Sequence, residues 1–366
     1  MGMIMAAGFV LMLLPDFTLL AQVEHIILGG YERVCLLFER LPGHTWLVGR
    51  PEIWKIVVYY LTLFLIIWLC SGDRVGEQKS ISGGARFRIR RSTWWACCLL
   101  LPVLFLGIRF NREDTMAFLA VGQGDCIVLM TQTGKTYLFD GGSSSEKSVG
   151  EDIIQPFLAY HGVSKIDGVF LSHPDEDHMN GVIELLEKKL VEVGCIYLPD
   201  VAEECKADCQ EIIEASPQIV YYSAGDYLKE GESLITCMHP SEGFYGETNA
   251  YSGCFLVESP GWKVLLTGDV EANGENLLTE QLIANKIEQV QILKVPHHGS
   301  KYSMEEKFLN AFSTQLAIIS CGKENAYGHP HDETIGKLEK KGIPYCITWQ
   351  SGCITVTKEG YQFFKR

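Results

Sequence analysis

The sequence predicts an α/β protein of the α+β kind, in which sheets covered by helices are preceded by transmembrane helices. Three observations lead to this prediction. Residues 53–70 form an apolar run with one charge, short apolar runs separated by turn residues begin at Met116, and strand-like and helix-like segments alternate from about residue 153. Strands that come first and strand–helix pairs that follow are typical of sheets packed against helices.

The net charge changes sign near residue 110. Residues 1–110 hold 11 of the 31 Lys and Arg and 7 of the 45 Asp and Glu, so their net charge is +4 and that of residues 111–366 is -18. The 47% hydrophobic content excludes a disordered chain, and Gly and Pro without a short period exclude collagen. We therefore expect two domains, a membrane region at 1–110 and a water-facing domain at 111–366.

Two segments are predicted to span a membrane. Ile53–Cys70 reads IWKIVVYYLTLFLIIWLC, and its one charge, Lys55, lies near enough to the end to reach lipid headgroups. Trp94–Ile108 is shorter, but the excess of Arg and Lys in the connection 71–93 places that connection in the cytoplasm and favours a second span. The chain is then a multi-pass protein of the cell membrane, with residues 111–366 outside the cytoplasm.

The first forty residues are also apolar in part. Met1–Leu14 is too short for a span and is interpreted as the tail of one, rather than as a signal peptide, because no basic residues precede it. Apolar residues recur at helical spacing over 19–38. This spacing predicts an amphipathic helix that lies either at the membrane interface or against neighbouring spans.

From Met116 the chain reads as a strand meander followed by alternating helices and strands. The runs MAFLAV, CIVLMT and TYLFD are separated by the turn residues GQGD and QTGK. The later elements are expected to be a helix near Ile153–Tyr160, a strand at Gly168–Leu171, a helix at Gly181–Lys189, strands at Cys195–Leu198 and Trp262–Thr267, a helix at Glu275–Asn285, a strand at Gln291–Val295, a helix at Met304–Phe312 and a strand at Leu316–Ser320.

Potential metal ligands follow the predicted strands. Ser172–His178 reads SHPDEDH, Leu265–Asp269 reads LLTGD, Lys294–Ser300 reads KVPHHGS and Gly328–His331 reads GHPH. The first, third and fourth of these segments hold six of the eight His of residues 111–366. Such clustering makes chance a poor explanation, and imidazoles with carboxylates suit Zn, Mn or Fe.

The first segment can serve two adjacent ions. His173 and Asp175 can point one way, whereas Asp177 and His178, which open the next helix, point toward a neighbouring position. Asp269 ends a strand and could bridge both ions. Two cations placed in this way hydrolyse phosphodiesters by in-line displacement.

These motifs resemble those of the metallo-β-lactamase superfamily, whose H-x-H-x-D-H signature appears here as His173-x-Asp175-x-Asp177-His178. The stretches FLAVGQGDCIVLMT, TYLFDGG, LSHPDEDHMNG, LLTGD, LKVPHHGS and NAYGHP follow the order of the carboxy-terminal domain of the ComEC family of DNA-uptake competence channels. The resemblance covers roughly residues 113–360 and implies a four-layer αββα sandwich with a dinuclear site at one edge. The residues before it are similar to the last spans of that family's channel domain, so we expect a fragment or a shortened relative.

The resemblance also implies the ligands of two divalent ions, Mn²⁺ or Zn²⁺. They are His173, Asp175, Asp177, His178, Asp269, His298 and His329. The superfamily's middle histidine has no clear match in 247–252, so His298 or His297 is expected to supply that nitrogen, with His239 as the rival candidate. Relatives commonly have Asp where this chain has Ala120. If that acid orders the site, its replacement by Ala is expected to weaken the activity.

The implied activity is that of a membrane-anchored, metal-dependent nuclease that degrades one strand of incoming DNA. Asp177, Asp269 and His297 are the expected catalytic residues, with His297 as proton donor if it is not a ligand, and Asp175 favours Mn²⁺ over Zn²⁺. A membrane channel, the lipid bilayer and other competence proteins are the expected partners.

Two alternatives remain, because a charge of -18 does not favour a broad grip on DNA. One is an extracellular metallohydrolase of a cell-envelope phosphodiester, of the phosphorylcholine esterase type. The other is a non-catalytic, metal-stabilised cap on the DNA channel.

Overall fold

The computed structural model describes residues 18–40, 46–72, 103–108, 113–201, 209–241 and 247–364. The chain divides into two compact units, Met1–Val48 and Gly49–Arg366, and each is described by itself. In the first unit, helix α2 spans Thr18–Glu39, as the spacing of the apolar residues predicts. The apolar run Met1–Leu14 lies outside the described residues.

Helix α3 (Ile53–Gly72) carries the long apolar run of the second unit. The Nζ of Lys55 donates a hydrogen bond to the carbonyl oxygen of Ile108 at 2.8 Å. Of the predicted second span Trp94–Ile108, residues 94–102 lie outside the part of the chain that is described. Among the residues that are described, no helix combines the length and apolar character needed to cross a membrane.

An eight-stranded mixed sheet forms one half of the globular region. In spatial order its strands are β17 (Gly360–Phe364), β16 (Cys353–Thr357), β1 (Thr115–Phe118), β2 (Ile127–Met130), β3 (Thr136–Phe139), β5 (Gly168–Phe170), β7 (Ile196–Pro199) and β8 (Ile219–Tyr222). Neighbours from β17 to β3 are antiparallel, and those from β3 to β8 are parallel. The parallel strands β3 and β5 therefore end at the same edge of the sheet.

A seven-stranded sheet faces the first one. Its strands are β15 (Tyr345–Ile347), β14 (Ser313–Ile319), β13 (Gln289–Lys294), β12 (Trp262–Leu266), β11 (Cys254–Ser259), β10 (Ser233–His239) and β9 (Tyr227–Glu230). The strands β12 to β15 are parallel, so the residues that follow them gather at one edge. Two short strands, β4 (Lys165–Ile166) and β6 (Glu192–Val193), pair separately.

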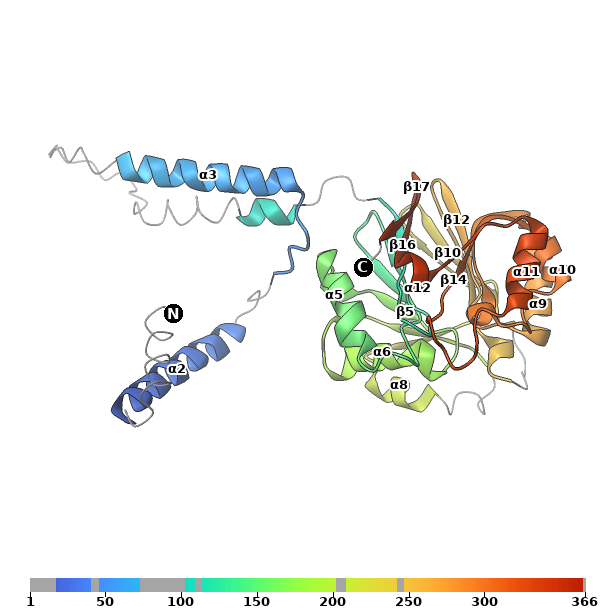
Figure 1. Ribbon diagram of the computed structural model, residues 1–366, viewed down its shortest axis with the longest axis horizontal. Helices are drawn as coiled ribbons and strands as arrows, with labels where there is room; N and C mark the ends of the chain where they lie inside the picture. The colour runs from blue at the N-terminus through green and yellow to red at the C-terminus, as the bar shows by residue number, and fades with distance from the viewer. Residues whose placement is uncertain are drawn as a thin grey trace. The chain divides into compact units, whose positions relative to one another are not determined.

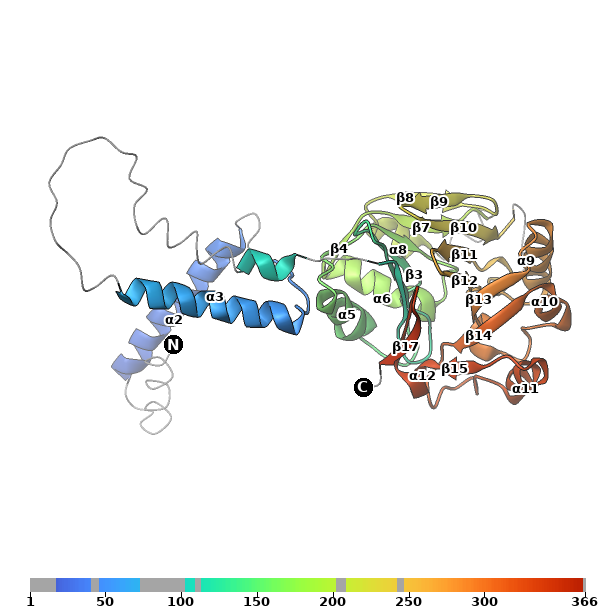
Figure 2. The same ribbon diagram turned by 90° about the horizontal axis from the view of Figure 1, so that it is seen from above.

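Helices cover the outer face of each sheet (Figures 1 and 2). The first sheet is covered by α5 (Gln155–Tyr160), α6 (Glu176–Glu187) and α8 (Gln210–Ala215), and the second by α9 (Ala272–Ala284), α10 (Glu306–Ala311) and α11 (Asp332–Lys341). One apolar core lies between the sheets and one lies under each set of helices.

Strand β1 shows how the sequence produces these layers. Met116 and Phe118 point into the central core, whereas Ala117 and Leu119 face the helices. The alternation follows from the two-residue period of a strand, and continuous burial on both faces is what a sheet between two layers requires. The globular region is thus the predicted four-layer αββα sandwich.

Candidate metal centre

The predicted ligand segments meet at one edge of the sandwich. Strand β5 leads into His173, β12 leads into Asp269, and β13 leads into the turn η5 (Pro296–Gly299) that carries His298. The ring centroid of His178, in the first turn of α6, lies 4.1 Å from that of His173 and 5.3 Å from that of His298. Both sheets therefore contribute side chains to one centre.

Three buried histidines are each held through Nδ1. The contacts, each of 2.9 Å, are His173 with Ser172 Oγ, His178 with Asp140 Oδ2 and His298 with the carbonyl oxygen of Ser320. The Nε2 atoms of all three are buried and have no hydrogen-bond partner within the described residues. A buried polar atom without a partner is costly, and metal-binding histidines are usually held through the other ring nitrogen in this way. These three Nε2 atoms therefore have the arrangement of metal ligands.

The carboxylate of Asp269 lies among these nitrogens. Its Oδ2 is 3.3 Å from His178 Nε2 and 3.2 Å from His298 Nε2, and Asp177 Oδ2 is 3.4 Å from the same His298 nitrogen. Ligand atoms of His173, His178 and Asp269 lie within 4.8 Å of one another, and so do those of Asp177, His178 and His298. The two groups share His178 and offer imidazole nitrogen with carboxylate oxygen. The residues present thus fit divalent cations.

Ion pairing shifts the pKa values in the centre. Burial by itself would raise the pKa of Asp177, but the imidazole of His298, 3.4 Å away, and the charge of His178 lower it to about 2. Burial opposes the charge of His298, but Asp269 and Asp177 raise the pKa of this imidazole to about 9. The positive charges of His298, His178 and Lys294 hold the pKa of the buried Asp269 well below its ordinary value. Protons on the imidazoles balance the carboxylates here, a balance that a divalent cation can take over.

Asp175 and His297 lie beside the centre. Asp175 precedes α6, its side chain is half exposed, and its Oδ2 is 3.5 Å from His173 Nε2. The Nε2 of His297 is 3.7 Å from Asp269 Oδ2, and its Nδ1 is 2.7 Å from Glu271 Oε1. The backbone of His297 is left-handed, with φ 46°, a conformation that is uncommon for non-glycine residues. Within the described residues, the groups of ligand atoms that lie within 4.8 Å of one another include neither Asp175 nor His297.

His329 and His239 differ in their distance from the centre. The ring centroid of His329 lies 5.3 Å from that of His297, and its Nδ1 lies 3.5 Å from Gln123 Nε2. Burial, together with the neighbouring histidines, lowers the pKa of His329 to about 4, so its imidazole is neutral at pH 7. The Nε2 of His239 instead contacts the carbonyl oxygen of Ala250 at 2.8 Å. Within the described residues, no ligand-atom group contains either histidine.

Sequence reasoning missed Asp140, the carboxylate that orients the centre. It follows β3 and accepts hydrogen bonds from the backbone N–H of Ser172 at 2.7 Å and from its hydroxyl at 2.8 Å, besides its contact with His178. Ligand atoms of Asp140 also lie near those of Asp125 and His178. Because its oxygens are already engaged, Asp140 positions His178 rather than adding a ligand. It ends the run TYLFD, so the strand-end pattern that indicated Asp269 also contained this signal.

A buried lysine was missed as well. Lys294 has no exposed surface, and its Nζ pairs with Asp125, lies 3.4 Å from Asp269 Oδ1 and donates to the carbonyl oxygen of Gly268 at 2.8 Å. Burial favours the neutral amine, but the two carboxylates outweigh it and raise the pKa of Lys294. The ammonium group therefore joins the loop after β1 to the ends of β12 and β13.

The fold and these motifs define the class of protein. A model of the metallo-β-lactamase superfamily matches residues 119–323, and the chain belongs to that superfamily. Its curated relatives confirm the resemblance to competence proteins of the ComEC family.

Three relatives show the extent of the similarity. "ComE operon protein 3" of Bacillus subtilis (strain 168) is 28% identical over 327 residues, which are 85% of this chain and 40% of the relative. "Recombination protein 2" of Haemophilus influenzae is 30% identical over 72% of this chain and 31% of its own length. "Competence protein ComA" of Neisseria gonorrhoeae is 31% identical over 67% of this chain and 32% of its own length. The chain thus spans well under half the length of these relatives.

Proposed function

We propose that this chain is a metal-dependent phosphodiesterase that degrades one strand of DNA during its uptake. The observation that carries the proposal is the convergence of the buried imidazoles of His173, His178 and His298 on the carboxylate of Asp269. The names of the curated relatives, which refer to competence and recombination, support DNA as the substrate.

The residues that would hold two cations are His173, His178 and Asp269 on one side and Asp177 with His298 on the other. Divalent cations held there would supply Lewis-acid activation of a water molecule and would balance the negative charge of the phosphate. Asp140 and Ser320 fix the orientation of the imidazoles, so that Nε2 faces the substrate side of the edge. Asp175, whose Oδ2 lies 3.5 Å from His173 Nε2, would add a third carboxylate and favour Mn²⁺ over Zn²⁺.

His297 is placed to handle the proton of the leaving oxygen. Its side chain is one quarter exposed, whereas His298 is buried. Glu271 contacts Nδ1 of His297, which leaves Nε2 directed toward Asp269 and solvent. A positioned imidazole of this kind contributes by general acid catalysis.

Digestion of end-labelled DNA by the full chain tests this function. With Mn²⁺ present we expect cleavage of single-stranded DNA, and with EDTA none. Asp269→Asn should reduce the rate at least about 100-fold, because it removes the anionic ligand that lies between His178 and His298. His239→Gln is the matched control, since Gln can still donate to Ala250 and the variant keeps all the proposed ligands. A protein that binds Mn²⁺ but cleaves neither single-stranded nor double-stranded DNA is not a nuclease.

The acidity of residues 111–366, 38 Asp and Glu against 20 Lys and Arg, favours a second candidate. A hydrolase of a cell-envelope phosphodiester, such as a phosphorylcholine ester, needs no extended basic surface. Hydrolysis of p-nitrophenyl phosphorylcholine, with no cleavage of DNA, would select it. A non-catalytic cap on the channel would instead tolerate Asp269→Asn in a transformation assay.

We also propose that the residues before 111 hold the enzyme at the cell membrane, with residues 111–366 on the outer side. Large apolar side chains of α3 are exposed, among them Ile53 at 75% and Phe64 at 69%. Lipid, a DNA channel and other competence proteins are the partners that this location implies. Flotation of the full chain with liposomes tests it, and a chain that stays at the bottom of the gradient contradicts it.

A further inference from the structure

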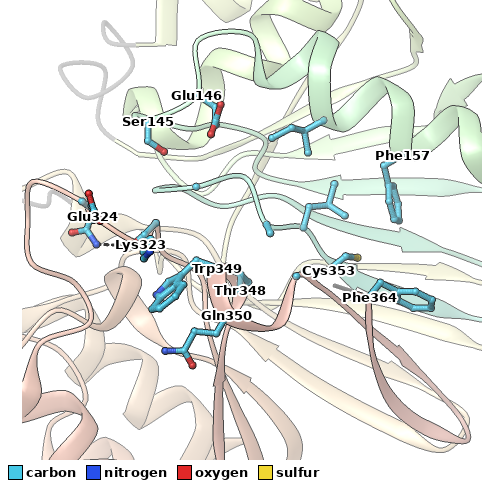
Figure 3. A pocket seen from close by; sticks show the side chains of 17 residues that line it. Ser145, Glu146, Phe157, Lys323, Glu324, Thr348, Trp349, Gln350, Cys353 and Phe364 are labelled. Atoms are coloured by element: carbon cyan, nitrogen blue, oxygen red, sulfur yellow. Dashed lines mark hydrogen bonds between the residues drawn. The ribbon is translucent and has the colours of Figure 1, made fainter. Parts of the chain in front are cut away.

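A pocket of about 620 Å³ is lined by residues that include Gly322–Asn325 and Thr348–Gln350 (Figure 3). Its wall includes Gly322 and Asn325, which contact Gln123 and His329. The backbone N–H of Gly322 donates to Gln123 Oε1 at 3.3 Å, and Nδ2 of Asn325 donates to the carbonyl oxygen of His329 at 2.6 Å. The volume lies in the range of sites that enclose small molecules. The pocket therefore continues outward from the edge where His329 lies.

The lining changes in character along the pocket. Figure 3 shows Lys323 and Glu324 at one end and Phe157 and Phe364 at the other. Trp349, on the short helix α12 (Thr348–Ser351), lies between the two ends and is 39% exposed. The pocket thus presents a cation, a large aromatic face and then an apolar end.

We propose that this pocket binds the nucleotide next to the scissile phosphodiester, with its base stacked on Trp349 and its backbone beside Lys323. This inference rests on the proposed function, because it takes the reacting group to be a phosphodiester at the metal centre. A nucleotide joins an anionic phosphate to a flat aromatic base, and the pocket offers partners for both. Asn325, in the pocket wall, contacts the backbone of His329, and the ring centroid of His329 lies 6.2 Å from that of the proposed ligand His298.

Stacking supplies most of the affinity in this arrangement. The pocket carries Lys323 against Glu146 and Glu324, so its net charge does not attract a polyanion. Protein–DNA affinity that depends on counterion release needs an excess of Lys and Arg. Stacking of bases on aromatic side chains needs no such excess, and it tolerates any sequence because every base has a π face.

A quaternary ammonium group fits the pocket less well than a base. Such cations are bound within cages formed by several aromatic faces. Figure 3 shows the ring of Trp349 well apart from those of Phe157 and Phe364, so the three rings do not enclose a point. A single exposed indole is instead the usual platform for one base.

Anisotropy measurements on the full chain in EDTA, where no DNA is cleaved, test the proposal. The probes are a short fluorescein-labelled oligo(dT) and an abasic oligonucleotide of the same length and charge. Trp349→Ala should weaken binding of oligo(dT) about 5- to 100-fold, whereas Trp349→Phe, which keeps a ring, should weaken it less than about threefold. Both variants should bind the abasic probe as the wild type does. Equal weakening for the two probes would show a structural defect and overturn the assignment.

Two further variants complete the design. Lys323→Gln should reduce the slope of log affinity against log salt by about 0.7, the value for one phosphate contact on a single strand. Tyr227→Ala, which removes a ring that is 72% exposed on β9 and does not line this pocket, is the control and should bind both probes normally. An unchanged slope in Lys323→Gln overturns the backbone contact.

The failure of the subsite and the failure of the nuclease can be told apart. Cleavage of DNA with Mn²⁺ by wild type and Trp349→Ala at equal rates and equal affinities overturns the subsite and leaves the nuclease standing. Trp349-dependent binding of oligo(dT) without cleavage overturns the nuclease and supports the subsite. Loss of p-nitrophenyl phosphorylcholine hydrolysis in Trp349→Ala, with DNA binding unchanged, overturns the nucleotide assignment.

Discussion

Replacement of Lys294 by Met isolates the role of the buried ammonium group. Met keeps an unbranched side chain at the end of β13 but removes the positive charge. Asp125, which is 1% exposed, would then lose its counter-ion, and Asp269 would lose the contact at 3.4 Å. The backbone carbonyl of Gly268 would also lose its donor.

The size of the effect follows from burial. Removal of one partner of a buried ion pair costs about 3–5 kcal/mol of folding free energy, because the other charge remains away from water. Lys165→Met is the matched control, since Lys165 pairs with Glu192 at 2.7 Å but both side chains are largely exposed, at 45% and 67%. An exposed pair contributes about 0–1 kcal/mol. Lys294→Met should therefore cost at least about 2 kcal/mol more than the control.

Urea unfolding of the full-length variants in EDTA measures the difference, because bound cations would otherwise compensate for the lost charge. Asp125→Asn in the Lys294→Met background should recover part of the loss, since the uncompensated carboxylate is then absent. Equal stabilities of Lys294→Met and Lys165→Met would refute the reasoning. So would a double variant no more stable than Lys294→Met alone.

Three further predictions concern the centre and the helix layer. Asp140→Asn should weaken Mn²⁺ binding about 10- to 100-fold by calorimetry, because His178 loses the carboxylate that orients it; an unchanged affinity contradicts that role. Gly142→Ala should lower both stability and Mn²⁺ affinity, because the added Cβ would lie 2.4 Å from the backbone of Asp177, and wild-type behaviour in both assays counts against this packing. Burial raises the pKa of Glu275 to about 7 against an ordinary 4.5, although the N–H groups of Met304 and Glu305 oppose the shift. A raised pKa means that the folded state holds the proton more tightly, so this contribution to stability is full below about pH 4.5 and is lost as the pH rises through 7, by up to about 3 kcal/mol. Denaturation at pH 5 and pH 8 should show a smaller difference in Glu275→Gln than in the wild type, and equal differences would exclude Glu275 as the source.

The sequence predicted the parts of the fold that depend on local pattern. Alternating or continuous apolar runs identified β5, β12, β13 and β14, and the residues after them indicated His173, Asp269 and His298. The predicted helix at 181–189 begins earlier, at Glu176, which places Asp177 and His178 in its first turn.

The remaining features depend on tertiary contacts. Strand β17, whose residues are all exposed, and strand β9 carry little apolar pattern, so periodicity could not indicate them. The pairing of Lys294 with Asp125 joins residues 169 positions apart and has no local signal. The roles expected of Asp175, His297 and His329 depend on loop conformation and remain predictions.

The centre draws its donors from both halves of the sandwich: Asp177 and His178 from the layer of the first sheet, Asp269 and His298 from the second. A cation bound between them would therefore link the two sheets. A shift of one sheet relative to the other would separate its ligands. The packing of the apolar core between the sheets would therefore determine the distances between the metal ligands at the edge. Core residues at the opposite ends of the strands, such as Trp262 at the start of β12, would thereby affect metal affinity.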